Sequence, residues 1–282
     1  AANCQFIIDA LSSKDKTKKS KLNLRINSII LRRVNVAYNE RYAPLTPGKF
    51  NPKHLSVSRI NTNISLKSIT NEAINLRIRS LSFHEASGLQ VNNLHFKLYA
   101  SKTEAHIEDF YLEMPHTHIN QGQLIASYDI RKGFSSLLPT LRIGATTNKM
   151  QISTTDLQPF VNFPKGMNLT LNLSSTFLLT PQKWQFSQLN ITDTENKLSL
   201  KGNVTIDHRG KAFRNTKVSL SSLSLSQTLI NDAVHWAKLP QSTAEILSRV
   251  GNIHANGNLS YEKNHIQSTL LAKTSVGEIA AN

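Results

Sequence analysis

The hydrophobic pattern of the chain is dominated by one spacing that occurs five times. Two apolar residues separated by one position are followed by two polar or small residues and then by a second such apolar pair. The five occurrences begin at Leu24, Leu76, Leu89, Trp184 and Val218. Each half alternates with a period of two, which is typical of a strand with one buried face. A β-bulge in the two-residue gap returns the second half to the same face, so the pattern predicts bent strands that share one apolar face.

Three of these occurrences supply the residues that we expect on the inward face of the sheet. They are Leu76, Ile78, Leu81, Phe83, Leu89, Val91, Leu94, Phe96, Trp184, Phe186, Leu189 and Ile191. The polar neighbours Arg77, Arg79, Gln90 and His95 are expected to point outward, with bulges at Ser80 and at Asn92 and Asn93. A closed hydrophobic core would bury the same apolar side chains, so the pattern alone does not tell a core from an open face.

The order of the elements predicts a mainly β protein with a few short helices. Strand patterns over 22–38, 54–67, 72–84, 88–99, 104–114 and 116–129 follow one another closely, as in an antiparallel meander. Helices are expected at about 154–163 and 227–250, the last with a capping box from Ser242 to Glu245 and Gly251 at its end. We therefore divide the chain into a β segment over 1–150 and a second β segment over 151–282 that carries the helical insertions.

The charge of the chain is large and uneven. The 282 residues carry a formal net charge of +15, and residues 1–80 hold 15 Lys and Arg against 4 Asp and Glu, so +11 lies there. A lysine-rich run between Lys14 and Lys21 and a strand remnant from Phe6 to Ile8 precede the first bent strand. Such a charge predicts attraction to polyanions, namely nucleic acid, anionic lipid headgroups or acidic polysaccharide. A solvated outer sheet face is the other interpretation.

Candidate chemistry is sparse. His116 and His118 would share one face of a strand close to Glu113, which is a possible partial metal site, but no third ligand has a recognisable spacing. Glycine-rich phosphate loops, nucleophile elbows and paired carboxylates are missing from the sequence. We therefore predict that the protein is not an enzyme and needs no cofactor or metal. A carbohydrate-active or adhesive solenoid would need a cluster of carboxylates or aromatic residues on one outer face.

Several phrases of the sequence resemble the AsmA-like superfamily, in particular the TamB-type translocation and assembly proteins of Bacteroidetes. The phrases are LNLRINSI at 22–29, VNVAY at 34–38, PGKFNPKHL at 47–55, INLRIRSLSFHEASGL at 74–89, LEMPHTHI at 112–119, the Asp156-Leu157-x-Pro159-Phe160 segment and TSVGEI at 274–279. The resemblance covers most of the chain.

The resemblance implies a long antiparallel sheet that curls into a groove, apolar inside and polar outside. It implies a periplasmic segment of an inner-membrane-anchored, envelope-spanning protein that carries phospholipid to the outer membrane and supports outer-membrane biogenesis. The groove residues would contact lipid acyl chains, and the partner would be an outer-membrane assembly protein of the BamA/TamA type. In this interpretation His116 and His118 bind no metal, and no nucleic acid is expected. The chain would be a central fragment of a longer protein.

Overall fold

A computed structural model describes residues 23–209, 212–262 and 265–281, so the predicted lysine-rich run and the remnant at Phe6 lie outside the described residues. The strands are β1 Asn23–Asn39, β2 His54–Thr70, β3 Ala73–Glu85, β4 Gln90–Val91, β5 Asn93–Ser101, β6 Glu104–Glu113, β7 His118–Ser127, β8 Arg142–Ser153, β9 Thr170–Leu179, β10 Lys183–Asp193, β11 Leu198–Arg209, β12 Ala212–Leu225, β13 Ile253–Glu262, β14 His265–Thr274 and β15 Gly277–Ala281. The helices are η1 Phe134–Ser136, α2 Leu137–Thr140, α3 Thr154–Leu157, α4 Gln227–Ala237 and α5 Gln241–Arg249.

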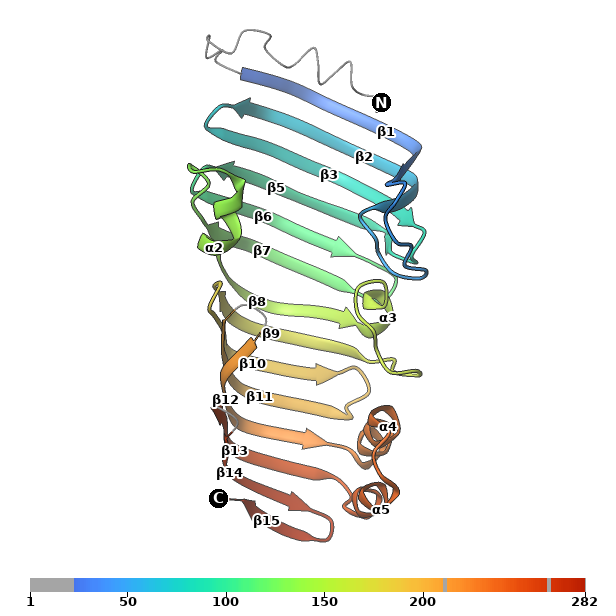
Figure 1. Cartoon of the computed structure of the whole chain (residues 1–282), viewed down its shortest axis with the longest axis vertical. Helices are drawn as coiled ribbons and strands as arrows, with labels where there is room; N and C mark the ends of the chain where they lie inside the picture. Colours follow the sequence, from blue (N-terminus) through green and yellow to red (C-terminus); the bar gives the residue numbers. More distant parts are fainter. Residues whose placement is uncertain (1–22, 210–211, 263–264, 282) are drawn as a thin grey trace.

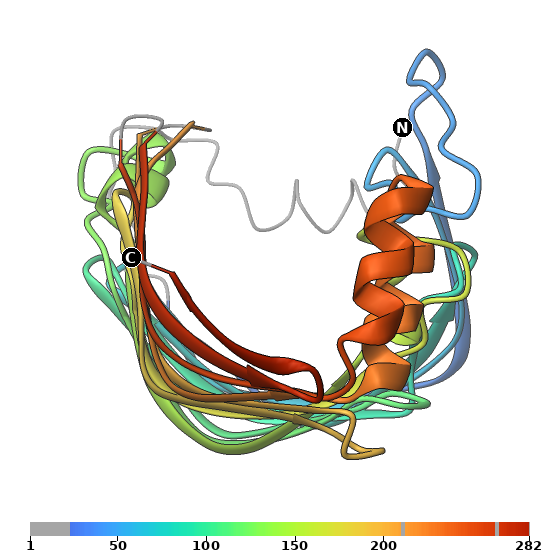
Figure 2. The same ribbon diagram turned by 90° about the horizontal axis from the view of Figure 1, so that it is seen from below.

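All the strands belong to one 15-stranded antiparallel sheet, which confirms the predicted fold class. Apart from the short β4, which pairs with β3, the strands follow one another across the sheet in sequence order from β1 to β15, and β3 pairs directly with β5 (Figure 1). Both β7 with β8 and β8 with β9 are hydrogen-bonded pairs, so the sheet runs without a break through the boundary at residue 150. Viewed from below, the sheet is curled into a trough with a U-shaped profile (Figure 2).

β-bulges bend the strands near their middles. In β10, Phe186 lies opposite Val204 but Leu189 lies opposite Gly202, so β10 contains one residue more than β11 at this point. The extra residue, Gln188, has a φ of 52°. Arg33, Arg59 and Asp109 have φ values of 52° to 55° at irregularities in β1, β2 and β6. Because a bulge bends and twists its strand, a series of bulges across the sheet produces the curl.

The register confirms the bulge that the sequence predicts at Ser80. Asn63 lies opposite Ser80, and the next residue, Ile64, lies opposite Ile78, so Arg79 is the extra residue of β3. The irregularity predicted at Asn92 and Asn93 is an interruption instead, because Asn92 separates β4 from β5.

Two helical predictions need correction. α3 ends at Leu157 rather than near 163, because Pro159 has no N–H with which to extend the helix; Ser153 is its N-cap and accepts a bond from the Thr155 N–H. The predicted capping box at Ser242 is wrong, since α5 begins at Gln241 with Pro240 at the N-cap and no side-chain cap. β8, η1 and α2 are elements that the sequence interpretation did not include.

A segment over residues 40–53, which we call the strap, connects β1 to β2 and reaches the residues after α3. The Phe50 N–H donates to the Pro159 carbonyl at 2.8 Å, and the rings of Phe50 and Phe160 lie 5.4 Å apart. Lys49 Nζ donates to the carbonyls of Gln158 and Val161. The strap thus runs along one margin of the trough, on the same side as α3, α4 and α5 (Figure 1).

The sheet forms a single layer with almost no closed core. Among the described residues, only five apolar side chains are buried, namely Val91, Met114, Leu189, Leu229 and Ile230. The accessible surface is 19071 Å², against roughly 12,000 Å² for a compact monomer of this mass. Most apolar side chains of the sheet are therefore half-buried.

Candidate functional site: an apolar trough

Apolar residues that lie directly opposite one another form a continuous row across eleven strands. From β5 to β15 the row is Leu94, Leu112, Ile119, Met150, Leu173, Ile191, Leu200, Leu223, Ala255, Ala272 and Ile279. Residues opposite one another in a sheet share a face. Ten strand-to-strand steps of about 4.8 Å make this first row roughly 48 Å long.

Two further rows run parallel to the first. The second row is Ile26, Leu66, Leu76, Leu98, Ile107 and Leu124, and resumes with Ala145, Phe177, Phe186, Val204, Val218 and Leu259. The third row is Leu24, Ile69, Ile74, Ala100, Ala105, Ala126, Ile143, Leu179, Trp184 and Ile206. Every one of these positions is apolar.

The regular strands prove that the rows share one face, which we call the inner face. On β9, Leu173 of the first row and Phe177 of the second are four residues apart, and four residues of an alternating strand return to the same side. Their partners on β10, Ile191 and Phe186, are five residues apart. Only the bulge at Gln188 allows that odd spacing, so the bulges keep the apolar rows aligned.

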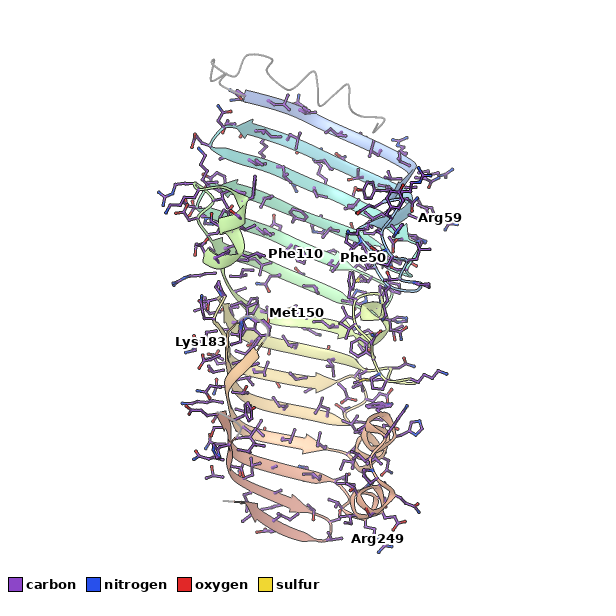
Figure 3. The ribbon with its side chains drawn as sticks, in the orientation of Figure 1. Phe50, Arg59, Phe110, Met150, Lys183 and Arg249 are labelled. Atoms are coloured by element: carbon purple, nitrogen blue, oxygen red, sulfur yellow. The ribbon has the colours of Figure 1, made fainter. Side chains whose placement is uncertain are left out.

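The inner face lines the trough. Phe110 and Met150 lie in the middle of the sheet on the side that faces the trough (Figure 3). Phe110 packs near Phe96, with ring centroids 6.2 Å apart, and Met150 belongs to the first row. No second layer of the described residues covers these side chains, and Trp184 remains 37% exposed.

The structure brings most of the sequence-predicted residues together on this face. Ile78 and Leu81 lie opposite Ile64 and Thr62, which alternate regularly on β2, so the two share a face as the spacing predicts. Phe83 lies opposite Val91. On β10, Leu189 is buried opposite Gly202. The exception is Leu89, which precedes β4 and belongs to no strand.

The predicted outward residues lie on the opposite, outer face. Arg77 faces Lys97 across β3 and β5, and both alternate with inner-face residues. His95 stacks on Tyr111 at 4.9 Å. Lys97 binds Asp109 at 2.6 Å, and this hydrogen bond and charge lower the pKa of Asp109. The sheet therefore separates an apolar side from a polar, charged side.

Sequence reasoning predicted β6 as a strand but missed its bulged spacing, and it missed β8 altogether. β6 carries the same bulged spacing in Ala105, Ile107, Phe110 and Leu112, and its small first residue concealed the match. β8 presents the polar Thr147 between Ala145 and Met150, which weakened its alternation. Thr147 is buried, and its Oγ1 donates to the Ser175 carbonyl, so the site tolerates a polar residue there.

Exposed apolar residues also mark both margins of the trough. Phe134 and Leu138, in η1 and α2, are 80% and 73% exposed at one margin. Tyr42 on the strap is 90% exposed, and Ile246 on α5 is 66% exposed, at the other margin. The segments that carry these residues lie along the two margins of the trough, α2 at one margin and the strap and α5 at the other (Figures 1 and 2).

The two histidines proposed as a partial metal site are not on one strand. His116 lies in the turn before β7, where its N–H donates to Asp156 at 2.8 Å, whereas His118 begins β7 opposite Glu113. Within the described ranges no group of three potential ligands is close enough to hold a metal ion.

The comparisons with known proteins add no further guidance. No protein-family model, no curated protein and no solved structure matches the chain. None of the helices in the described part of the chain has the length and apolarity to cross a bilayer.

Proposed function

We propose that the trough binds the acyl chains of phospholipid or a similar lipid, and that the protein is not an enzyme. The observation that carries this proposal is the first row, an unbroken apolar line of roughly 48 Å from Leu94 to Ile279. That length exceeds the roughly 30 Å hydrocarbon core of a bilayer. We expect such a long, uncovered apolar surface to bind an apolar ligand, because exposed apolar patches of this extent mark binding sites.

The chemistry of the inner face suits a conduit better than a pocket. Each CH₂ group that leaves water contributes roughly 0.8 kcal/mol, so a chain gains affinity wherever it lies along the rows. Because the three rows are apolar throughout, neighbouring positions differ little in free energy. A bound chain could then slide along the trough while its polar headgroup stays at the open side, in water.

The biological setting follows from the sequence resemblance and is part of the same proposal. In it, the chain is a periplasmic segment of an inner-membrane-anchored AsmA/TamB-like protein that spans the cell envelope. It carries phospholipid from the inner to the outer membrane and contributes to outer-membrane biogenesis with an assembly protein of the BamA/TamA type. The curled single-layer sheet and its apolar inner face support this setting.

Photo-crosslinking tests lipid binding at matched neighbouring positions. A benzophenone amino acid replaces Phe96 on the inner face in one variant and Lys97 on the outer face in the other. After incubation with radiolabelled phospholipid and irradiation, we expect labelled protein for position 96 and none for position 97. Delipidated protein that takes up no phospholipid, or equal labelling at both positions, would refute the proposal.

A further inference from the structure

The outer face of β1, β2 and β3 carries a dense group of exposed cations. We call it the basic face; its members are Arg25, Arg32, Arg33, Arg59, Lys67, Arg77 and Arg79. None of these seven side chains makes an ion pair with an acidic residue of the described chain. Together they account for much of the excess positive charge that the sequence shows in residues 1–80.

The bulges that curl the sheet also direct these cations outward. Leu31 and Val34 both belong to the apolar side of β1, so the two arginines between them project to the outer face. Arg59 and Arg79 likewise occupy irregular positions of β2 and β3. Hydrogen bonds from the backbone hold two of these arginines in place. The Arg33 N–H donates to Asn61 Oδ1 at 3.1 Å, and the Arg59 N–H donates to Asn35 Oδ1 at 3.0 Å.

The acidic residues of the same region are engaged elsewhere. Glu40 pairs with Lys53, and Glu72 pairs with Lys102. Glu85 is buried and accepts hydrogen bonds from Ser87. Among the described residues, no cation of the basic face forms an ion pair with a carboxylate, whereas on β5 and β6 Lys97 binds Asp109 at 2.6 Å. Arg77 is the member of the basic face whose charge also acts on Asp109.

We propose that the basic face binds a linear acidic polysaccharide. Its cations are spread over three adjacent strands, which lie about 5 Å apart, and polar residues such as Ser65 opposite Arg77 stand between them, so a chain that carries many carboxylate, phosphate or sulfate groups can contact several cations at once. The face is convex (Figure 2), and a flexible polymer can follow a convex surface. A planar bilayer would touch only a narrow strip, and Ile30 is the one large apolar side chain exposed there for insertion.

Nucleic acid fits this surface less well. Proteins that bind single strands stack bases on aromatic side chains, but Tyr38 and Phe83, the only Tyr, Phe or Trp residues of β1–β3, lie on the inner side. Duplex DNA is stiff over about 150 base pairs, so it does not wrap a tightly curved sheet. The proposal concerns the opposite face from the trough, and it stands or falls independently of lipid binding.

A heparin-binding experiment with two triple variants tests the inference. The first variant combines Arg59→Gln, Lys67→Gln and Arg79→Gln on the basic face. The control combines Lys149→Gln, Lys201→Gln and Lys217→Gln, which removes the same charge from β8, β11 and β12. Heparin serves as the acidic polysaccharide, and its affinity is measured over a series of salt concentrations, beside duplex DNA and anionic vesicles.

We expect the first variant to lose at least tenfold in heparin affinity at low salt, and its salt dependence to fall by about two to three units in log–log slope. The control should bind like the unaltered protein. Equal losses of heparin affinity in both variants would show that net charge, rather than the basic face, causes binding. Tighter binding to DNA or to vesicles than to heparin would identify another partner. Either result overturns the inference. Phospholipid uptake measured on the same samples reports separately on the trough.

Discussion

The backbone N–H of Gln188 donates a hydrogen bond to Oδ1 of Asn203, 3.0 Å away on the neighbouring strand β11. Gln188 is the residue with positive φ at the bulge of β10, and its N–H has no place in the regular ladder. Arg33 and Arg59 repeat the arrangement with Asn61 and Asn35. Side-chain amides thus accept hydrogen bonds from the backbone N–H groups that have no partner strand at the bulges. The bulges that curl the sheet therefore leave these N–H groups paired, which avoids the free-energy cost of unpaired backbone groups.

Removing one such amide should weaken the bulge without touching the inner face. We expect Asn203→Ala to lower the free energy of unfolding by about 1 kcal/mol, because the Gln188 N–H loses its partner. Asn203→Asp keeps an acceptor oxygen and should restore most of the loss. Urea denaturation of the three proteins measures the difference, and equal stability of the alanine and aspartate variants would contradict the assignment.

Gly257 is a second position at which we expect the backbone conformation to be essential for the stability of the sheet. It has a φ of 131°, and a Cβ atom at this position would lie 1.9 Å from the Thr269 carbonyl oxygen. Gly257→Ala should therefore destabilise the fold by about 2 to 3 kcal/mol. Gly122→Ala is the matched control, because a Cβ there meets nothing within 4 Å. Thermal unfolding of both variants tests the contrast, which fails if the two melt alike.

The ionisation of Glu85 makes the free energy of unfolding depend on pH. Burial raises its pKa, but hydrogen bonds from the Ser87 side chain and from the Ser87 and Ser56 N–H groups outweigh it, and the pKa is lowered. A lowered pKa contributes stability above the unfolded value of about 4.3, and this contribution is lost as the pH falls through the folded pKa.

Glu85→Gln should therefore cost about 1 to 2 kcal/mol at pH 7, where the carboxylate is ionised. The difference from the unaltered protein should shrink as the pH falls below about 4.3, since the carboxyl then becomes neutral as well. Urea unfolding at a series of pH values records this. A difference that stays constant across the series would show that the charge of Glu85 is not responsible.

Much of the fold could be predicted because bulged alternation is a local property. The bulged spacing of β1, β3, β10 and β12 can be recognised in the sequence, because both apolar pairs of each pattern consist of large side chains. β6 and β8 were harder to read, because Ala105 and Thr147 hold inner-face positions without a large side chain. The continuous rows could not be read at all, since they depend on register across strands, which the sequence of one strand does not contain.

The strap provides a test of local rather than global stability. Phe50 packs on Phe160 at 5.4 Å and donates its N–H to Pro159. Phe50→Ala should free the strap, so proteolytic cleavage within residues 40–53 should become several times faster while the melting temperature changes little. Leu45→Ala is the control, because Leu45 is 73% exposed on the same segment. Unchanged cleavage of the Phe50 variant would show that other contacts hold the strap.

The last prediction places a charge on the inner face. Leu81 and Leu94 are half-buried inner-face residues, and Ser82 is the outward neighbour of Leu81, opposite Asn61. Leu81→Asp or Leu94→Asp sets an unpaired carboxylate on an apolar wall, where burial against an acyl chain would cost several kcal/mol. Because the wall is open to water without lipid, both variants should fold.

We expect phospholipid uptake to fall at least tenfold in Leu81→Asp and Leu94→Asp and to remain normal in Ser82→Asp. The measurement is labelled phospholipid retained by each purified variant, with circular dichroism as the check of folding. Normal uptake by a folded Leu94→Asp variant would exclude lipid contact near β5. Loss of uptake in Ser82→Asp as well would mean that added negative charge, rather than its position on the inner face, blocks the lipid.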